Sequence, residues 1–467
     1  MRSHGSALNQ RFRRLVPGTL GPAIGRNTRW HPPQLIVLGF AGAILIGTLL
    51  LMLPFSRRGD GGAGFLEALF TSTSAVCVTG LAVVDTPVYW SFFGQFVILA
   101  LMQVGGFGIM SFASLLGVVL AHRLGLQSKI AAAAETKSTG FGDVRSVLLG
   151  VVKVSLFVEL IVAVVLTLRF VIGYDFDIGR AIWNGIFHAV SSFNNAGFAL
   201  FSDNLMPFVG DPWVCLPIAA AIIIGGLGFP VLFELRRRYR MPHHWSMNTK
   251  LVLLGTVILL LGGTGFIAAI EWNNASSIGA LGSADKLLAS FFQSVVTRTA
   301  GFNSVDIGAL DPVTWLGIDI LMFIGGGSAG TAGGLKITTF GVLFFILYTE
   351  VQGGTAVNVF GKRLARSVHR QAITVVLLSV AFVVGATMAL MLMTDFGLDR
   401  LLFEAVSAFA TVGLSTGITA QLPAAGQVLL IVLMFVGRLG PVTLASALAL
   451  RQRKSLYEFP RERPLIG

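Results

Sequence analysis

The chain repeats one short pattern four times, and this internal repeat constrains its fold more than any other feature. In each copy a phenylalanine is followed ten residues later by a glycine, and a second glycine-rich segment begins 24 to 28 residues beyond that glycine. The four glycines are spaced 117, 104 and 112 residues apart. Such a period predicts four copies of one supersecondary unit that pack around a common axis. The glycines are Gly80, Gly197, Gly301 and Gly413.

Composition and segment length indicate that these units lie in a membrane. Charged residues make up 12% of the 467 residues, about half the roughly 25% of soluble domains, and the mean hydropathy is +0.79. Four apolar stretches reach the roughly 20 residues that a spanning helix needs. A shorter apolar segment precedes each glycine and is too short to cross, so we expect it to be re-entrant. The long stretches are 35–53, 147–172, 251–270 and 372–393.

These features predict an all-α membrane protein of four tandem helix–pore-loop–helix repeats around a central pore. It would have eight spanning helices and four re-entrant pore helices. Six glycines between residues 325 and 334 would each cost a helix about 1 kcal/mol relative to alanine. The second helix of the third repeat is therefore predicted to be broken. The predicted segments are a cytosolic tail at 1–34, repeats at 35–125, 140–240, 245–350 and 366–452, and a C-terminal tail at 453–467.

The formal net charge of +12 could indicate nucleic-acid binding, but its distribution argues against that function. Most lysines and arginines lie at the borders of apolar blocks, whereas the intervening connections carry mainly aspartates. This is the positive-inside pattern, which predicts a multi-pass protein of the plasma (inner) membrane with both termini in the cytoplasm. Basic borders also attract anionic lipid head groups. The basic places are the N-terminal tail, 123–145, 236–250, 362–370 and 451–463.

The repeated glycines have a chemical rationale as an ion filter. A dehydrated cation in a membrane needs oxygen ligands, and four loops can supply a ring of backbone carbonyls. Glycine permits the unusual φ/ψ angles that such carbonyls require, and the preceding short helices would aim their partially negative ends inward. The filter segments contain no carboxylate, so a monovalent cation is favoured over calcium. The predicted filter residues are Val78, Thr79, Gly80, Asn195, Ala196, Gly197, Thr299, Ala300, Gly301, Thr411, Val412 and Gly413. The cation is expected at the carbonyls of Val78, Thr79, Asn195, Ala196, Thr299, Ala300, Thr411 and Val412.

Two cations stand where the bilayer should exclude them. Lys336 ends the glycine-rich loop, and Arg438 lies in the corresponding glycine-rich segment of the fourth repeat, residues 437–440. Such residues usually face a cavity and have partners. Lys336 could instead snorkel to the cytoplasm, whereas Arg438 is expected to bond carbonyls of the loop. The predicted gate comprises Gly325, Gly326, Gly327, Ser328, Ala329, Gly330, Thr331, Ala332, Gly333, Gly334, Lys336 and Arg438.

Three further polar residues are less informative. Glu159 could pair with Lys153 or Arg169 rather than touch an ion. His188, in a pore helix, is expected to be a structural hydrogen-bonding residue. Arg298 precedes the third glycine by three residues, where its guanidinium could brace the filter backbone.

Several motifs resemble the Trk/Ktr/HKT superfamily of potassium transporters. These are 77–81, 194–198, 297–303 and 411–415 for the filter loops, with 325–336 and 437–441 beyond them. Because only 34 residues precede the first apolar stretch, the chain is most similar to the membrane subunit of bacterial Ktr systems. That resemblance implies potassium as the substrate, a gating loop, a homodimer and a separate cytosolic ring that binds nucleotide. It also leaves sodium open as an activator and implies no cofactor on this chain.

Other functional classes fit less well. No Walker, Rossmann, HExxH or nucleophile-elbow pattern accompanies the glycines, so an enzyme is not predicted. An ion-coupled secondary transporter, sodium-coupled or sodium-conducting, stays open as the alternative. Such proteins often carry inverted repeats, whereas these four repeats run in the same order and favour a central pore.

Overall fold

The computed structural model describes residues 32–123, 144–354 and 356–440. The predicted C-terminal tail and nearly all of the N-terminal tail lie outside these residues, as do most of the basic segments at 123–145 and 451–463.

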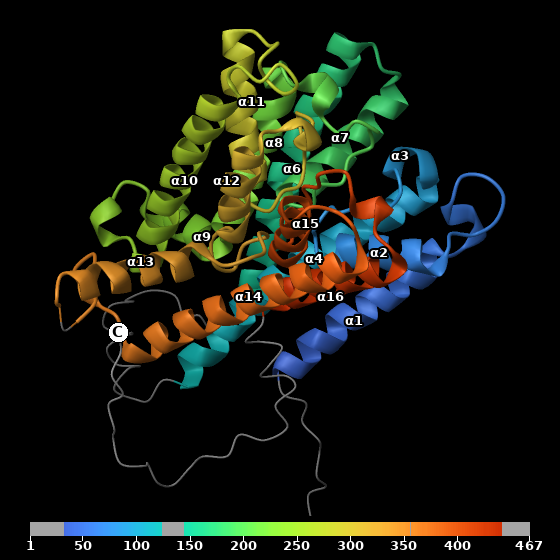
Figure 1. The fold of residues 1–467 in the computed structure, drawn as a ribbon. Coiled ribbons are helices and arrows are strands. Elements are labelled where there is room, and N and C mark those ends of the chain that lie inside the picture. Colours follow the sequence, from blue (N-terminus) through green and yellow to red (C-terminus); the bar gives the residue numbers. More distant parts are fainter. Residues whose placement is uncertain (1–31, 124–143, 355, 441–467) are drawn as a thin grey trace, which may run out of the picture.

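Each repeat consists of a long helix, a short helix that ends at the repeated glycine motif, and a second apolar segment (Figure 1). The first repeat has α1 Pro32–Leu51, α2 Phe65–Val76, α3 Thr86–Tyr89 and α4 Phe92–Arg123. The second has α6 Val144–Tyr174, α7 Ile178–Phe193, α8 Pro212–Leu227 and α9 Phe229–Arg238. The third has α10 Met247–Glu271, α11 Ser283–Val296, α12 Pro312–Phe323 and α13 Ile337–Val351. The fourth has α14 Arg366–Met393, α15 Leu398–Ala410 and α16 Ala424–Leu439.

Short elements connect these helices. The second helices of repeats two and three both begin at an Asp-Pro pair, in which the aspartate accepts a backbone N–H and the proline occupies the first helical turn. One small antiparallel ribbon joins the third and fourth repeats. The remaining short elements are the 3-10 helices η1 Pro54–Ser56, η2 Met206–Phe208, η3 Pro242–His244, η4 Ile307–Ala309 and η5 Thr419–Gln421, and the strands β1 Asn358–Val359 and β2 Lys362–Arg363.

The long first helices are the ones that can cross a bilayer on length and composition. Among the described residues, the spans are Gln34–Leu51, Leu149–Tyr174, Met247–Glu271 and Arg366–Met393. Large apolar side chains on these helices face outward, such as Ile172 at 76% and Leu392 at 89% exposure. The short helices are instead packed inside, where Phe187 is fully buried. An apolar exterior around a buried centre is the arrangement expected in lipid, so the prediction of an all-α membrane protein is confirmed.

The predicted break in the third repeat is present. Helix α12 ends at Phe323 and α13 begins at Ile337, with the glycine-rich segment between them. This segment, residues 324–336, is called the glycine loop below. The loop doubles back on itself, because Gly325 N–H donates to Leu335 O at 2.8 Å and Ile337 N–H donates to Gly326 O at 3.0 Å.

The second helix of the second repeat is also interrupted, which was not predicted from the sequence. In the second repeat, α8 and α9 meet at an angle of 97°. Gly228 at the bend has a φ of 89°, and Pro230 in the first turn of α9 has no N–H to continue a helix through this point. A Cβ at Gly228 would also collide with the carbonyl oxygen of Ser328, so the bend makes room for the glycine loop.

A buried carboxylate ties the end of α10 to the start of α12. Glu271 is fully buried and accepts from Asp311 N–H at 2.9 Å and from Thr314 Oγ1 at 2.5 Å. It also accepts from Ser277 Oγ at 2.5 Å and Asn274 Nδ2 at 2.7 Å. Removing it would leave four donors without this acceptor, and the Thr314 hydroxyl among them is buried.

We predict that Glu271→Ala lowers the free energy of unfolding by about 2–4 kcal/mol, because four hydrogen bonds to one carboxylate are lost and the Thr314 hydroxyl stays buried without an acceptor. Thermal unfolding of the detergent-solubilised protein, followed by tryptophan fluorescence, measures the change. Glu350→Ala, which removes an exposed glutamate from α13, is the matched control and should stay close to the parent. An unchanged unfolding temperature for Glu271→Ala would contradict the prediction.

Candidate functional site

The four repeated glycines meet in one closed ring. A Cβ on Gly197 would lie 2.7 Å from Ala300 O and 2.8 Å from Gly301 Cα, closer than real Cβ atoms approach. The other three glycines show the same relation: each would collide with the loop of the next repeat, and the fourth with that of the first. The contacts therefore run in the order Gly80, Gly197, Gly301, Gly413 and back to Gly80.

Each loop of this ring has two residues with left-handed backbone. The glycines have φ angles of 94°, 72°, 66° and 97° in chain order. Two positions earlier stand Val78, Asn195, Thr299 and Thr411, with φ angles of 53°, 58°, 67° and 52°. Three of these four residues are β-branched, for which a positive φ is a genuine outlier. Strain of this kind persists only where the surroundings enforce it, and it clusters at functional sites.

The short helices hold the loops through a shared serine. Thr79 N–H donates to Ser74 O at 2.8 Å, and Gly80 N–H donates to Ser74 Oγ at 3.0 Å. The fourth repeat matches this, because Gly413 N–H donates to Ser407 Oγ at 3.1 Å. In the second repeat Ser191 Oγ instead donates to Phe198 O at 2.8 Å. Sequence reasoning missed these serines, although a serine stands six residues before the glycine in three of the four copies.

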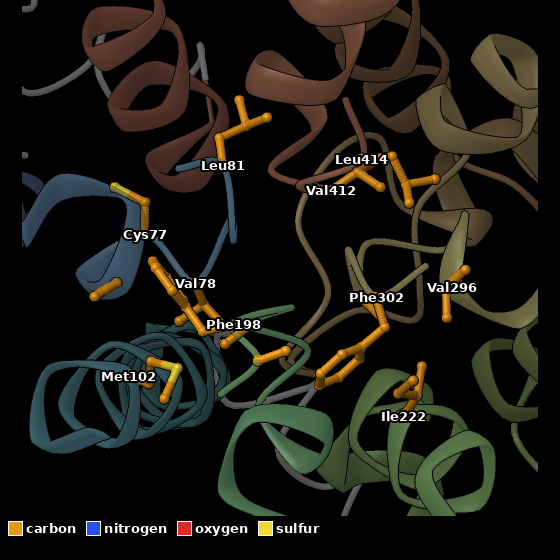
Figure 2. Close-up of a cluster of buried hydrophobic side chains, with 14 of the residues drawn as sticks. Cys77, Val78, Leu81, Met102, Phe198, Ile222, Val296, Phe302, Val412 and Leu414 are labelled. Carbon is orange, nitrogen blue, oxygen red and sulfur yellow. The ribbon is translucent and has the colours of Figure 1, made fainter. Parts of the chain in front are cut away.

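A large apolar residue follows each glycine and anchors the loop from outside. Figure 2 shows these side chains in a buried apolar cluster around the ring, each on a different loop. None is more than 2% exposed. The anchors keep the loop backbones at the centre while their side chains pack outward. They are Leu81, Phe198, Phe302 and Leu414.

In the second and fourth repeats, a polar side chain nine residues before the ring glycine bonds the backbone of the segment that follows that glycine. His188 Nε2 accepts from Leu200 N–H at 3.3 Å, and its Nδ1 lies 2.8 Å from Asn184 O. In the same register of the fourth repeat, Glu404 accepts from Thr416 N–H at 3.1 Å. The structure thus gives His188 backbone contacts, and Glu404 is a functional candidate that sequence reasoning missed. Their shared position in the repeat was the available signal.

Glu159 and Arg298 have other partners than expected. Arg169 forms its ion pair with Asp211 at 2.6 Å, and Glu159 accepts from Gln103 Nε2 at 3.0 and 3.2 Å. The expected pairing of Glu159 with a basic residue was therefore wrong. Gln103 in turn accepts from Asn194 Nδ2 at 2.8 Å, so this network ends beside Asn195, one of the predicted filter residues.

The Arg298 guanidinium does not brace the filter backbone. Its Nη2 lies 3.4 Å from Thr256 Oγ1 on α10, and its Nε has no hydrogen-bond partner among the described residues. The side chain is buried, and its one side-chain hydrogen bond among the described residues goes to α10 rather than to a filter loop.

The glycine loop lies against the ring on one side and is held by basic residues. Arg438 Nη1 donates to Thr331 O, and Lys336 Nζ donates to Ala332 O at 2.5 Å. Lys336 therefore turns into its own loop rather than snorkelling outward. On the side of the second repeat, Gly327 N–H donates to Gly226 O at 2.8 Å.

A cavity of about 360 Å³ opens on the other side of the ring. Its lining includes Gly80 and Gly197 together with residues that follow them in the chain. Asp85 and Asp203 are part of this lining and would attract cations. The ring thus lies between an acidic cavity and the glycine loop.

Comparisons with known proteins agree with this arrangement. The profile of the TrkH family, described as a cation transport protein, matches residues 44–456. The chain is 40% identical over 432 residues to the Ktr system potassium uptake protein B of Bacillus subtilis (strain 168), covering 92% of this chain and 95% of that protein. It is 34% identical over 445 residues to the potassium/sodium uptake protein NtpJ of Enterococcus hirae, covering 94% and 98%.

A solved structure shares the fold. The crystal structure of the potassium transporter TrkH from Vibrio parahaemolyticus superposes with a TM-score of 0.72 and 18% sequence identity, covering 91% of this chain and 86% of that chain. Together with the match over most of the sequence, these similarities show that the chain belongs to the TrkH family of cation transport proteins.

Proposed function

We propose that this chain takes up potassium across the plasma membrane through a carbonyl filter formed by the four-glycine ring. The observation that carries the proposal is the closed ring of loops, each with two left-handed residues of which one is a strained non-glycine residue in every copy. Such a backbone can present carbonyl oxygens to an ion, and rings of carbonyls replace the hydration shell of potassium. The names of the similar uptake proteins support potassium as the substrate.

The proposal also includes the ion positions, the repeat boundaries and the orientation of the chain in the membrane. The ions would bind at the carbonyls of the two residues before each glycine. The repeats would occupy 35–125, 140–240, 245–350 and 366–452. Both termini would face the cytoplasm, which places the glycine loop on the inner side of the filter and the acidic cavity on the outer side.

Serine in place of a ring glycine should damage selectivity. In Gly80→Ser and Gly413→Ser, the added side chain meets a carbonyl of the next loop at a positive φ. We expect potassium-to-sodium selectivity to fall at least tenfold, about 1.4 kcal/mol, or flux to be lost. Reversal potentials in liposomes under defined potassium and sodium gradients measure this ratio.

Gly385→Ser on α14 is the matched control, because a Cβ there meets nothing within 4 Å. Parent-like selectivity in both ring variants, with normal folding, would refute the filter. A parent that prefers sodium would instead favour the sodium-conducting alternative, to which the name of the Enterococcus hirae relative also points.

The glycine loop, with Arg438, is proposed as the gate. It lies beneath the ring, and the Arg438 guanidinium holds the carbonyl of Thr331 while 4% exposed. A loop free of regular structure can move without unfolding a helix, whereas the ring cannot move without breaking its own contacts.

Arg438→Ala should therefore raise flux in the absence of a regulator by roughly 10- to 100-fold, the range expected for one charged hydrogen bond. Potassium-driven flux into liposomes measures it, with Arg180→Ala as a control because that arginine stacks on Phe176 away from the loop. A second variant that lacks residues 329–332 should behave like Arg438→Ala. If both fold and conduct at the parent rate, the gate lies elsewhere.

A separate cytosolic ring that binds nucleotide is the proposed regulator, acting on a homodimer of this chain. Two of the predicted basic segments belong to elements that pack together: α10, α13, the β1–β2 ribbon and α14 share a small apolar core. Lys250 Nζ lies 6.0 Å from the centre of the Phe360 ring, which connects the start of α10 to this ribbon. One basic face would thus be available for docking, and it would also contact anionic lipid.

Changing Arg236, Arg237, Arg238 and Arg363 to glutamine should weaken co-purification of the regulator and make it more sensitive to salt, because interactions of exposed charges are screened. Nucleotide-dependent flux should require the regulator. The control changes Arg58 and Arg180 to glutamine; Arg58 lies in the connection before α2, and Arg180 lies in the first turn of α7. Full nucleotide regulation of the purified chain alone would overturn the two-component proposal.

A further inference from the structure

In each loop of the ring, the left-handed residue two positions before the glycine also makes contacts through its side chain. In the second repeat, Asn195 Oδ1 accepts from Thr331 Oγ1 at 2.9 Å. In the third repeat, Thr299 Oγ1 accepts from Gly333 N–H at 3.2 Å. All four residues in these two bonds are buried, so neither bond has to compete with water. Two filter loops are therefore bonded directly to the glycine loop.

The fourth repeat reaches the same place without a bond. A Cβ on Gly333 would collide with Thr411 Oγ1, and that hydroxyl has no hydrogen-bond partner among the described residues. The first repeat differs, because its left-handed residue is Val78, which packs near Gly105 of α4. Three of the four loops thus direct this side chain at the glycine loop.

Thr331 is the centre of these contacts. Its N–H donates to Gly225 O of α8 at 3.1 Å, its hydroxyl donates to Asn195, and its carbonyl accepts from Arg438. One residue of the glycine loop therefore contacts the second helix of repeat two, the filter segment of repeat two and the second helix of repeat four.

We propose that Asn195 and Thr299 form a latch that holds the glycine loop closed under the filter. The latch also couples the position of the loop to the backbone geometry of the filter. The proposal rests on the filter and gate assigned above. The two bonded side chains belong to residues whose left-handed backbone sets the direction of the filter carbonyls. When the loop leaves, these residues lose a buried partner, and the strained backbone loses part of what enforces it. Ion selectivity therefore depends on whether the loop is in place.

A double-mutant cycle tests the latch between Asn195 and Thr331. Thr331→Val removes the hydroxyl at nearly constant shape, and Asn195→Ala removes its acceptor. Each should raise potassium flux of the full-length protein in liposomes, without regulator, by roughly 2- to 12-fold, as expected for one neutral hydrogen bond. The double variant should show little further increase, because both changes remove the same bond. Increases that multiply would overturn the proposal.

Thr299 provides an independent arm with a selectivity readout. Thr299→Val keeps the β-branched shape at the positive φ but cannot accept from Gly333 N–H, whereas Thr299→Ser retains the acceptor. The valine variant should raise unregulated flux and lower potassium-to-sodium selectivity, and the serine variant should restore both toward the parent. Equal behaviour of valine and serine variants would contradict the latch.

Thr264→Val is the matched control, because the Thr264 hydroxyl donates at 2.7 Å to Leu260 O of its own helix. It should match the parent in flux, selectivity and unfolding temperature. If the parent and the control select potassium and respond to the regulator, and the latch variants match them in flux and selectivity, the latch alone is refuted. A parent that shows no potassium selectivity would refute the proposed function itself.

Discussion

The closure of four backbone segments around one point is the constraint on which the rest of the structure depends. Gly80 and its three counterparts touch the next loop so closely that no Cβ fits between them. The chain must bring four loops to the same level although they are more than 100 residues apart. The short helices bring the loops to that level, and in the first and fourth repeats Ser74 and Ser407 accept a hydrogen bond from the ring glycine. The outward apolar anchors then complete each loop without entering the ring (Figure 2).

Repetition made much of this arrangement predictable. Four glycines in one register, with apolar stretches of membrane length, specify the repeat unit and the place where the units meet. The break in the third repeat was also readable, because six glycines oppose a helix. The bend at Gly228 was not predicted, since Gly-Phe-Pro lies in an apolar stretch and the neighbouring Ser328 comes from a different repeat. Partners such as Gln103 for Glu159 depend on how helices from different repeats pack, which no local pattern contains.

The copies are similar where they meet and different where they touch the glycine loop. The ring needs four equivalent backbones, so its glycines recur in every repeat. Beneath it, a single loop from the third repeat contacts its neighbours in unequal ways: Asn195 offers it a side-chain acceptor and Arg438 a donor, whereas Val78 packs near Gly105 instead. A tandem arrangement in one chain permits this inequality, whereas four identical subunits would have to place four such loops beneath the same opening.

The bend between α8 and α9 gives the second repeat a mechanical property. Helix α9 has ten residues and is therefore about 15 Å long, with its basic residues at the far end. At its near end, Phe229 N–H donates to Ala329 O at 3.3 Å, and Gly228 lies against Ser328 of the glycine loop. A force on Arg236 or its neighbours would act at the tip of a rigid arm whose pivot is a single glycine. Because Phe229 is bonded to Ala329, a displacement of the basic end of α9 would be transmitted to the glycine loop.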